Sequence, residues 1–330
     1  MKLRLALVAV ILSIAGHAQT KINGLSFVAS NTPISDLAVQ PVLDNNANWV
    51  ALMPFGFLKT ESDTVIIYNS KRQWWGETKI GIAKTAAAFH NKKCKVMLKP
   101  QIWIPNGGFT GNIAMKSERD WVKFENSYEK FILDYAQVAA DNQVELFCIG
   151  TELNNFLVKR TAFWNALIIK IKGIYKGKIT YAENWDTYDK VPFISSLDYI
   201  GIDAYFPLSK QKSPTTGTLK SAWKPIKSKI KTLSIKYKKL ILFTEFGYQS
   251  RDFSTDQPWN HNSGSEVNLE IQYNALNALF DQFWDEGWFA GGFLWKWYDN
   301  HTTSGGSTNT DYTIQSKPAE KLVKKQFLKS

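Results

Sequence analysis

Leu146-Phe147-Cys148-Ile149-Gly150-Thr151-Glu152 is an apolar run that stops at a carboxylate. Leu240-Ile241-Leu242-Phe243-Thr244-Glu245 repeats this arrangement further along the chain. Runs that are apolar at nearly every position are typical of parallel strands covered on both faces. Each run therefore predicts a buried parallel strand with a glutamate at its carboxyl end.

Similar apolar runs lie on both sides of these two, and most are separated by segments with helical periodicity. The predicted strands are Ile22–Ala29, Trp49–Leu58, Lys95–Ile104, Leu146–Leu153, Lys178–Trp185, Tyr199–Phe206, Leu240–Tyr248 and Phe289–Trp297. The predicted helices are Ile34–Asn45, Glu77–Asn91, Ser117–Asp141, Ala162–Tyr175, Leu219–Tyr237, Glu266–Glu286 and Pro318–Leu328.

Strands that alternate with helices predict parallel βαβ units. Eight such strands in one chain of this length match a single α/β domain, the (β/α)8 TIM barrel. A doubly wound open sheet is the alternative, and it is disfavoured because no GxGxxG or Walker loop follows the first strand.

The composition excludes several classes of protein. With 44% hydrophobic and 21% charged residues, the chain is not intrinsically disordered, and two cysteines cannot build a disulfide scaffold. The 13 Trp, 13 Tyr and 20 Phe supply either a heavy aromatic core or flat surfaces on which sugars or bases stack. The net charge is +11, but the lysines are scattered, which favours a basic surface over a nucleic-acid partner.

The first residues resemble a secretory signal. Lys2 and Arg4 precede an apolar run, Leu5–Ala15, and the small residues Gly16 and Ala18 stand at the −3 and −1 positions of a cleavage site. We expect residues 1–18 to be removed and residues 19–330 to form the catalytic domain of an exported protein, periplasmic or extracellular. The apolar run is too short to span a bilayer, so no membrane insertion is expected.

Export would permit a disulfide between Cys94 and Cys148. Both lie in strand-like apolar surroundings, which favours two separate buried thiols. The four histidines show no metal-ligand spacing, so neither a metal nor another cofactor is predicted.

Polar residues follow most of the predicted strands, where the chemistry of such barrels is located. Two carboxyl groups that face one cavity suit glycoside hydrolysis, one as proton donor and the other as nucleophile. Glu152 and Glu245 are the leading pair, with Glu183 and Asp203 as competing carboxylates. Asp203 and Tyr205 share one face of their strand. The polar strand ends are Lys99, Thr151-Glu152, Glu183-Asn184-Trp185, Asp203-Ala204-Tyr205, Thr244-Glu245 and Trp295-Lys296-Trp297.

Four motifs together resemble glycoside hydrolase family 113, a family of clan A barrels, over about Ile22 to Tyr298. They are Cys148-Ile149-Gly150-Thr151-Glu152-Leu153, Phe243-Thr244-Glu245-Phe246-Gly247-Tyr248, Gly201-Ile202-Asp203-Ala204-Tyr205-Phe206-Pro207 and Met97-Leu98-Lys99-Pro100.

This resemblance implies a β-mannanase that cleaves β-1,4-linked mannose chains with retention of configuration. It puts the acid/base on Glu152, the nucleophile on Glu245, and a tyrosine that hydrogen-bonds the nucleophile at Tyr205. The clan usually has Asn before the acid/base, in contact with the sugar 2-OH. This chain has Thr151 there, and Asn184 is a possible substitute.

The remaining substrate-binding candidates are Lys99, Asp203 and aromatic residues at strand ends. Trp103, Trp185, Trp295 and Trp297 could stack on pyranose rings, and Trp74 and Trp75 could line a cleft edge, whereas Trp121, Trp164 and Trp284 fall on apolar helix stripes and are expected in the core.

The predicted partner is an oligo- or polysaccharide, and the oligomeric state stays open. Two other functions remain: a retaining glycosidase for another β-linked glycan, and a glycan-binding barrel without catalysis. The second is disfavoured because a binding protein needs neither a proton donor nor a nucleophile.

Overall fold

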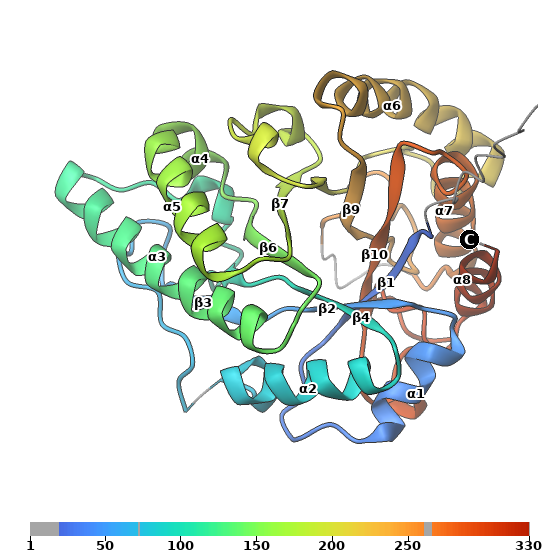
Figure 1. Ribbon diagram of the computed structural model, residues 1–330. Coiled ribbons are helices and arrows are strands. Elements are labelled where there is room, and N and C mark those ends of the chain that lie inside the picture. The colour runs from blue at the N-terminus through green and yellow to red at the C-terminus, as the bar shows by residue number, and fades with distance from the viewer. Residues whose placement is uncertain (1–19, 72, 261–265, 330) are drawn as a thin grey trace, which may run out of the picture.

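Eight parallel strands close into a barrel in the computed structural model, which describes residues 20–71, 73–260 and 266–329 (Figure 1). Their order around the ring is β1-β10-β9-β8-β7-β6-β4-β2. The predicted single (β/α)8 barrel is confirmed, whereas the predicted signal at residues 1–18 lies outside the described residues. The strands are β1 (Ile22–Phe27), β2 (Trp49–Leu52), β4 (Lys95–Leu98), β6 (Leu146–Thr151), β7 (Lys178–Asn184), β8 (Ile200–Asp203), β9 (Ile241–Phe246) and β10 (Phe289–Trp297).

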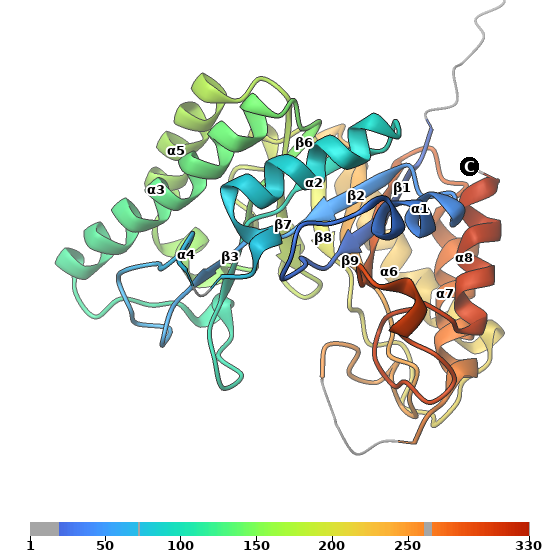
Figure 2. The ribbon, with the colours of Figure 1, turned by 90° about the horizontal axis from the view of Figure 1, so that it is seen from below.

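Helices surround the barrel, as Figures 1 and 2 show. One short helix, α4, was not predicted, because six residues are too few to show a clear helical period. In the described chain no α-helix connects β7 to β8, where only two short 3-10 turns occur, at Tyr188–Lys190 and Ile194–Ser196. The helices are α1 (Asp36–Asp44), α2 (Lys79–Asn91), α3 (Glu118–Asp141), α4 (Asn154–Lys159), α5 (Thr161–Ile174), α6 (Thr216–Tyr237), α7 (Leu269–Phe283) and α8 (Pro318–Leu328).

The second and third predicted strands are each broken by a proline. Pro54 separates β2 from β3 (Phe55–Phe57), and Pro100 separates β4 from β5 (Gln101–Trp103). The prediction of unbroken strands at 49–58 and 95–104 is therefore wrong, because proline cannot donate a ladder hydrogen bond. Past the break, β3 and β5 pair with each other as a small parallel sheet beyond the carboxyl ends of β2 and β4.

The strands of the ring are not joined equally. β2 and β4 pair over four residues, from Trp49↔Lys95 to Leu52↔Leu98. By contrast, β4 and β6 pair only at Met97↔Leu146 and Leu98↔Phe147. The pairing of β4 with β6 is therefore shorter than the pairings on either side of it, β2 with β4 and β6 with β7.

Two apolar cores hold the fold together. The larger lies between the strands and the helices, and it contains Trp121, Trp164 and Trp284, as predicted. The smaller fills the barrel itself around Phe293. Gly24 faces that ring, since a Cβ on Gly24 would lie 2.3 Å from Phe293 Cδ1. The barrel interior contains Ile22, Ala51, Met97, Leu146, Cys148, Ala182, Tyr199, Leu242, Ala290 and Phe293.

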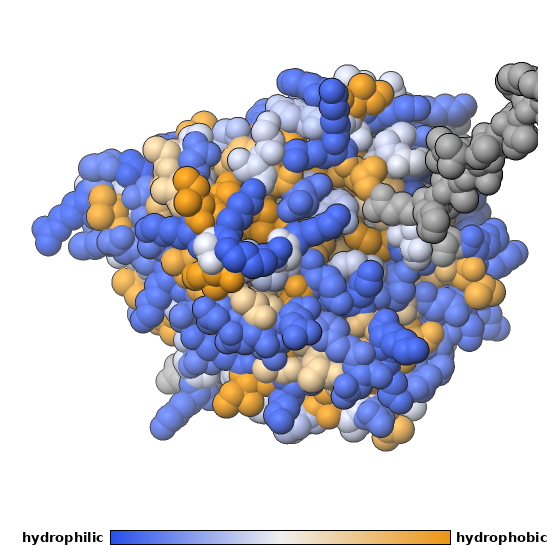
Figure 3. Space-filling model, in the orientation of Figure 1, coloured by the Kyte–Doolittle hydropathy of each residue, from blue (hydrophilic) through white to orange (hydrophobic). Residues whose placement is uncertain are grey.

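Cys94 and Cys148 are both buried and both free, so the preferred interpretation of two separate thiols is confirmed. Hydrophilic side chains cover much of the face seen in Figure 3, with scattered apolar ones between them. None of the helices in the described chain is both long and apolar enough to cross a bilayer.

Candidate active site

A β-bulge aims Glu245 into the site. Leu242 packs inside the barrel and Phe243 packs outside it, so simple alternation would turn Glu245 outward. The pairing of β8 with β9 shifts from Ile202↔Phe243 to Asp203↔Glu245, which leaves one extra residue, Thr244, in β9. Such an insertion reorients the side chains that follow it, and here Glu245 reaches the polar cluster at the barrel mouth.

The Glu245 carboxylate accepts hydrogen bonds from three side chains. Lys99 Nζ and Gln101 Nε2 both donate to Oε1, the latter over 2.9 Å. Tyr205 donates its hydroxyl proton to Oε2 over 2.9 Å, the hydrogen bond that the resemblance implies. An ionised carboxylate is acceptor-only, and three donors match that state.

Lys99 joins Glu245 to Asp203. Its Nζ lies 3.2 and 3.1 Å from the two Asp203 oxygens, and Thr244 Oγ1 donates to Asp203 Oδ1 over 2.7 Å. Burial alone would lower the pKa of Lys99, but the two carboxylates outweigh it and raise that pKa. Burial and the Glu245 charge raise the pKa of Asp203 to about 7, against the opposing effect of Lys99.

Both residues were expected to bind substrate. The structure instead buries Lys99 completely and leaves Asp203 only 1% exposed. Lys99 hydrogen-bonds Glu245 directly, whereas Asp203 is joined to Glu245 through Lys99.

Glu152 follows β6 in a left-handed backbone conformation, with φ of 51°. Its N–H donates to the Ala182 carbonyl over 2.8 Å, and its own carbonyl accepts from Thr110 Oγ1 over 3.1 Å. These bonds fix a backbone geometry that is uncommon for a non-glycine residue. Burial raises the pKa of the Glu152 carboxyl well above its ordinary value, and the charges of Asp203 and Glu245 add to the effect. Burial and the neighbouring negative charges therefore favour the protonated form of Glu152.

A hollow of about 440 Å³ opens at the carboxyl end of the barrel, on the side of β1, β3, β5 and β10, and neither Glu152 nor Glu245 is among its lining residues. Trp103 is 54% exposed there, and Trp74 and half-buried Trp295 line the same wall. The sequence prediction of Trp74, Trp103 and Trp295 at a cleft is thus matched by their placement around one cavity. Glu77, Gln73 and Lys296 supply polar groups to it.

The other predicted aromatic residues lie elsewhere. Trp185 stacks on Trp259 with ring centroids 5.1 Å apart, so these two rings form a second aromatic group after β7 and β9. Asn184 Oδ1 accepts from the Trp185 backbone N–H over 3.0 Å. Trp297 is fully buried against His301, so its prediction as a sugar platform is wrong: the ring faces outward from the strand into the core.

Two residues at the site were missed. The prediction of one strand over 95–104 hid Gln101; Pro100 ends the barrel strand, and Gln101 then begins β5 beyond the barrel mouth. Trp259 lies in a long turn-rich segment where no sequence period signals its position.

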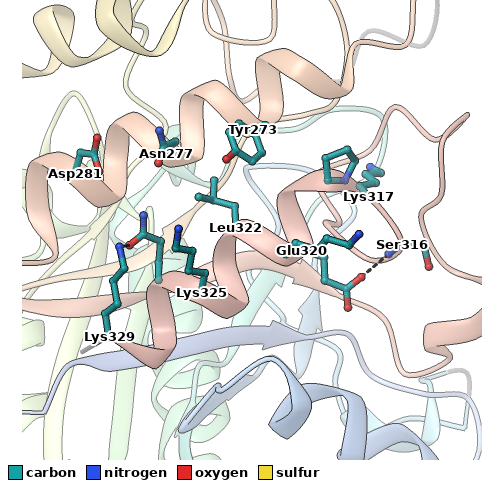
Figure 4. Close-up of a pocket in the computed structure, with 12 residues that line it drawn as sticks. Tyr273, Asn277, Asp281, Ser316, Lys317, Glu320, Leu322, Lys325 and Lys329 are labelled. Atoms are coloured by element: carbon teal, nitrogen blue, oxygen red, sulfur yellow. Dashed lines mark hydrogen bonds between the residues drawn. The ribbon is translucent and has the colours of Figure 1, made fainter.

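Another large hollow, of about 910 Å³, lies away from these groups between α7 and α8 (Figure 4). Its carboxylates are already engaged: Asp281 pairs with Lys220, and Glu320 accepts from the Ser316 N–H. Over residues 20–71, 73–260 and 266–329, no group of three His, Cys, Asp or Glu residues is arranged to hold a metal ion.

Comparisons with known proteins point to one family of barrel enzymes. The sequence profile of Glycoside Hydrolase Family 113 matches residues 30–317. A GH113 β-mannanase from Alicyclobacillus acidocaldarius, AaManA, solved with ManMIm, is 26% identical over 94% of this chain and 97% of that one, with a TM-score of 0.82. A further GH113 β-1,4-mannanase shares 21% identity over 94% and 99% of the chains (TM-score 0.81).

A more distant structure shares the fold alone. A β-glucuronidase from Ruminococcus gnavus is 13% identical, and the match covers 89% of this chain and 46% of that one, with a TM-score of 0.58. A search of curated protein sequences gave no match.

Proposed function

The chain belongs to Glycoside Hydrolase Family 113 and is a glycoside hydrolase. On that premise we propose that it is a retaining endo-β-1,4-mannanase, with Glu245 as nucleophile and Glu152 as acid/base. The observation that carries the proposal is the contrast between the two glutamates. Glu245 is held by three donors that suit a carboxylate, whereas the pKa of Glu152 is raised.

The contrast matches the two steps of retention. In the first, Glu245 attacks the anomeric carbon and the bond to the leaving oxygen breaks, while Glu152 gives that oxygen its proton. In the second, the Glu152 carboxylate takes a proton from water as the water oxygen replaces Glu245 at the anomeric carbon. Each glutamate then returns to its starting protonation state.

The neighbours of Glu245 keep it ready for the first step. Lys99 and Gln101 fix Oε1, and Tyr205 fixes Oε2, so the carboxylate cannot rotate freely. Holding a nucleophile in its reactive orientation lowers the entropic part of the barrier.

A mannose chain as substrate is supported by the family and by the aromatic cavity. The exposed ring of Trp103, with Trp74 and Trp295, offers flat apolar surfaces for pyranose faces. The secretory pattern before Gln19 supports action outside the cytoplasm.

Product stereochemistry on a panel of mannan, glucomannan, cellulose and xylan tests the proposal. We expect fastest cleavage of mannan, with the β-anomer as the first product in proton NMR spectra and the α-anomer appearing only by mutarotation. First formation of the α-anomer would establish inversion and remove the nucleophile role from Glu245. Preference for cellulose or xylan would change the substrate but keep the mechanism.

Substituting each glutamate in turn distinguishes their proposed roles. Glu245→Ala should lower kcat by several orders of magnitude, at about 1.4 kcal/mol of transition-state stabilisation per decade, and azide should restore part of it as a glycosyl azide.

Glu152→Gln should remove the basic limb of the pH–rate profile, because that limb reports loss of the Glu152 proton as pH rises through its raised pKa. Glu183→Gln is the matched control on the neighbouring strand, and it should keep activity within a few fold.

A further inference from the structure

A third hollow, of about 830 Å³, lies at the opposite end of the barrel from the glutamates. It is formed where strands begin: Ile22 opens β1, Trp49 opens β2, Lys95 opens β4 and Lys178 opens β7. Tyr199, just before β8, completes the floor. We call it the basal hollow.

Five lysines converge on the basal hollow, and in the described part of the chain none forms a salt bridge. Lys21 and Lys176 donate only to backbone carbonyls, the former to Glu286 and Phe289. Five lysines against two lining carboxylates leave an excess of positive charge, which attracts anions. The five are Lys21, Lys93, Lys95, Lys176 and Lys178.

Two acids line the hollow, and both have structural tasks. Glu145 Oε2 accepts from the Val96 N–H over 2.9 Å and lies 3.1 Å from His90 Nε2. Asp198 Oδ2 accepts from the Ile179 N–H over 2.8 Å. Because each holds the first amides of a strand, neither is directed at a lysine.

Two of the ammonium groups are positioned by aromatic rings. Lys95 Nζ lies 5.6 Å from the centroid of Trp49, and Lys178 Nζ lies 5.1 Å from that of Tyr199. Lys178 Nζ also donates one hydrogen bond to the Tyr199 hydroxyl over 3.4 Å. Cation–π attraction positions an ammonium group without neutralising it, so its remaining N–H groups can donate to a ligand. The rings therefore fix two charges over the floor of the cavity without neutralising them.

From this arrangement we propose that the basal hollow binds a ligand that carries clustered phosphate groups. The lining contains lysine but no arginine among the described residues. Lysine binds phosphate as a compact point charge, and five lysines around one cavity suit a ligand whose negative charges are close together. The same phosphates could belong to a soluble polyphosphate-type ligand or to lipid headgroups, and this site is independent of the proposed mannanase function.

Binding of two probes tests the proposal and separates the two sources. The first probe is tripolyphosphate, followed by calorimetry at low salt. The second is vesicles of phosphatidylglycerol in phosphatidylcholine, compared with phosphatidylcholine alone. Lys95→Gln with Lys178→Gln should weaken binding roughly tenfold or more, because each lysine near an anionic surface contributes on the order of one decade. Added salt should weaken binding by the unchanged protein as well.

The matched control is Lys224→Gln with Lys236→Gln on α6. Lys236 also lies over a tyrosine ring, 5.1 Å from the centroid of Tyr237, so the control removes the same charge and the same kind of contact elsewhere. It should bind as the unchanged protein does, and thermal unfolding should show both double variants folded. Tripolyphosphate binding alone indicates a soluble ligand, and vesicle binding indicates headgroups. No binding of either probe, or equal losses in the two double variants, would overturn the proposal.

Discussion

Lys99 is one buried cation shared by two carboxylates, Asp203 and Glu245. An unpaired charge at full burial is costly, so the three groups depend on one another. Glu152 adds a fourth ionisable group at the same mouth, and its raised pKa limits the negative charge that the cluster must carry. At the scale of single residues, the site is a balance of charges in which each protonation state is set by its neighbours.

Removing the shared cation should upset this balance. Lys99→Gln should destabilise the fold by about 3–5 kcal/mol, because two buried carboxylates lose their partner. Activity should fall as well, because Glu245 Oε1 loses the hydrogen bond from Lys99. Urea unfolding and initial-rate measurements check both effects. Asp203→Asn added to Lys99→Gln should recover stability, and no recovery would show that charge is not the cause.

Glu183 gives a pH dependence of stability. Burial raises the pKa of its carboxyl from 4.5 to about 7, despite hydrogen bonds from the Asn184 N–H and Thr187 that favour the charged form. Between these values the folded protein binds a proton that the unfolded chain has released, so this contribution to stability is lost as pH rises through about 7. The difference amounts to at most about 3 kcal/mol. Glu183→Gln should leave the free energy of unfolding nearly unchanged at pH 5 and raise it at pH 8. An equal change at both values would contradict the account.

At the scale of elements, apolar runs and helical periods predicted every strand of the barrel and seven helices. A strand buried on both faces is apolar at nearly every position, whereas a helix buried on one face has apolar residues at intervals of three and four. The same patterns found the two glutamates at the ends of β6 and β9. They could not find the bulge at Thr244, because an extra residue in a strand leaves no periodic trace, nor the Lys99 contacts, which join separate strands through side-chain geometry. Pro54 and Pro100 are the sequence signals that mark the ends of β2 and β4, and the apolar pattern alone does not show these breaks.

The small sheet of β3 and β5 should act as a wall for substrate. Trp103→Ala should raise KM for mannan roughly threefold to tenfold, from the loss of about 0.5–1.5 kcal/mol of ring contact, with a smaller change in kcat. Stability should change little because the ring is more than half exposed. Initial rates on mannan check this, with Tyr273→Ala in the α7–α8 groove as control. An unchanged KM would remove Trp103 from the binding surface.

At the scale of the whole molecule, the two candidate sites lie at opposite ends of one barrel. The carboxyl ends of the strands carry the glutamates and the aromatic cavity, and the amino ends carry the basal hollow. Between them lies a closed, tightly packed interior, and its packing sets the stability of both ends.

That interior leaves no room at Gly24. Gly24→Ala should destabilise the protein by about 1–3 kcal/mol, because the added Cβ would overlap the Phe293 ring. Shortening that side chain with Phe293→Leu should offset part of the loss. Chemical unfolding of the two single variants and the double variant forms a cycle that measures the coupling. Purely additive effects would mean that the two residues do not compete for space.

The short pairing between β4 and β6 is the place where we expect local opening of the barrel. With only two residue pairs there, few ladder bonds must open before the strands can slide, so amide protons at this joint exchange with solvent at a lower free-energy cost than those of longer joints. β4 leads into Lys99 and β6 leads into Glu152. The shortest pairing around the barrel's charged cluster thus lies between the strand that leads to Lys99, a hydrogen-bond donor to Glu245, and the strand that leads to Glu152.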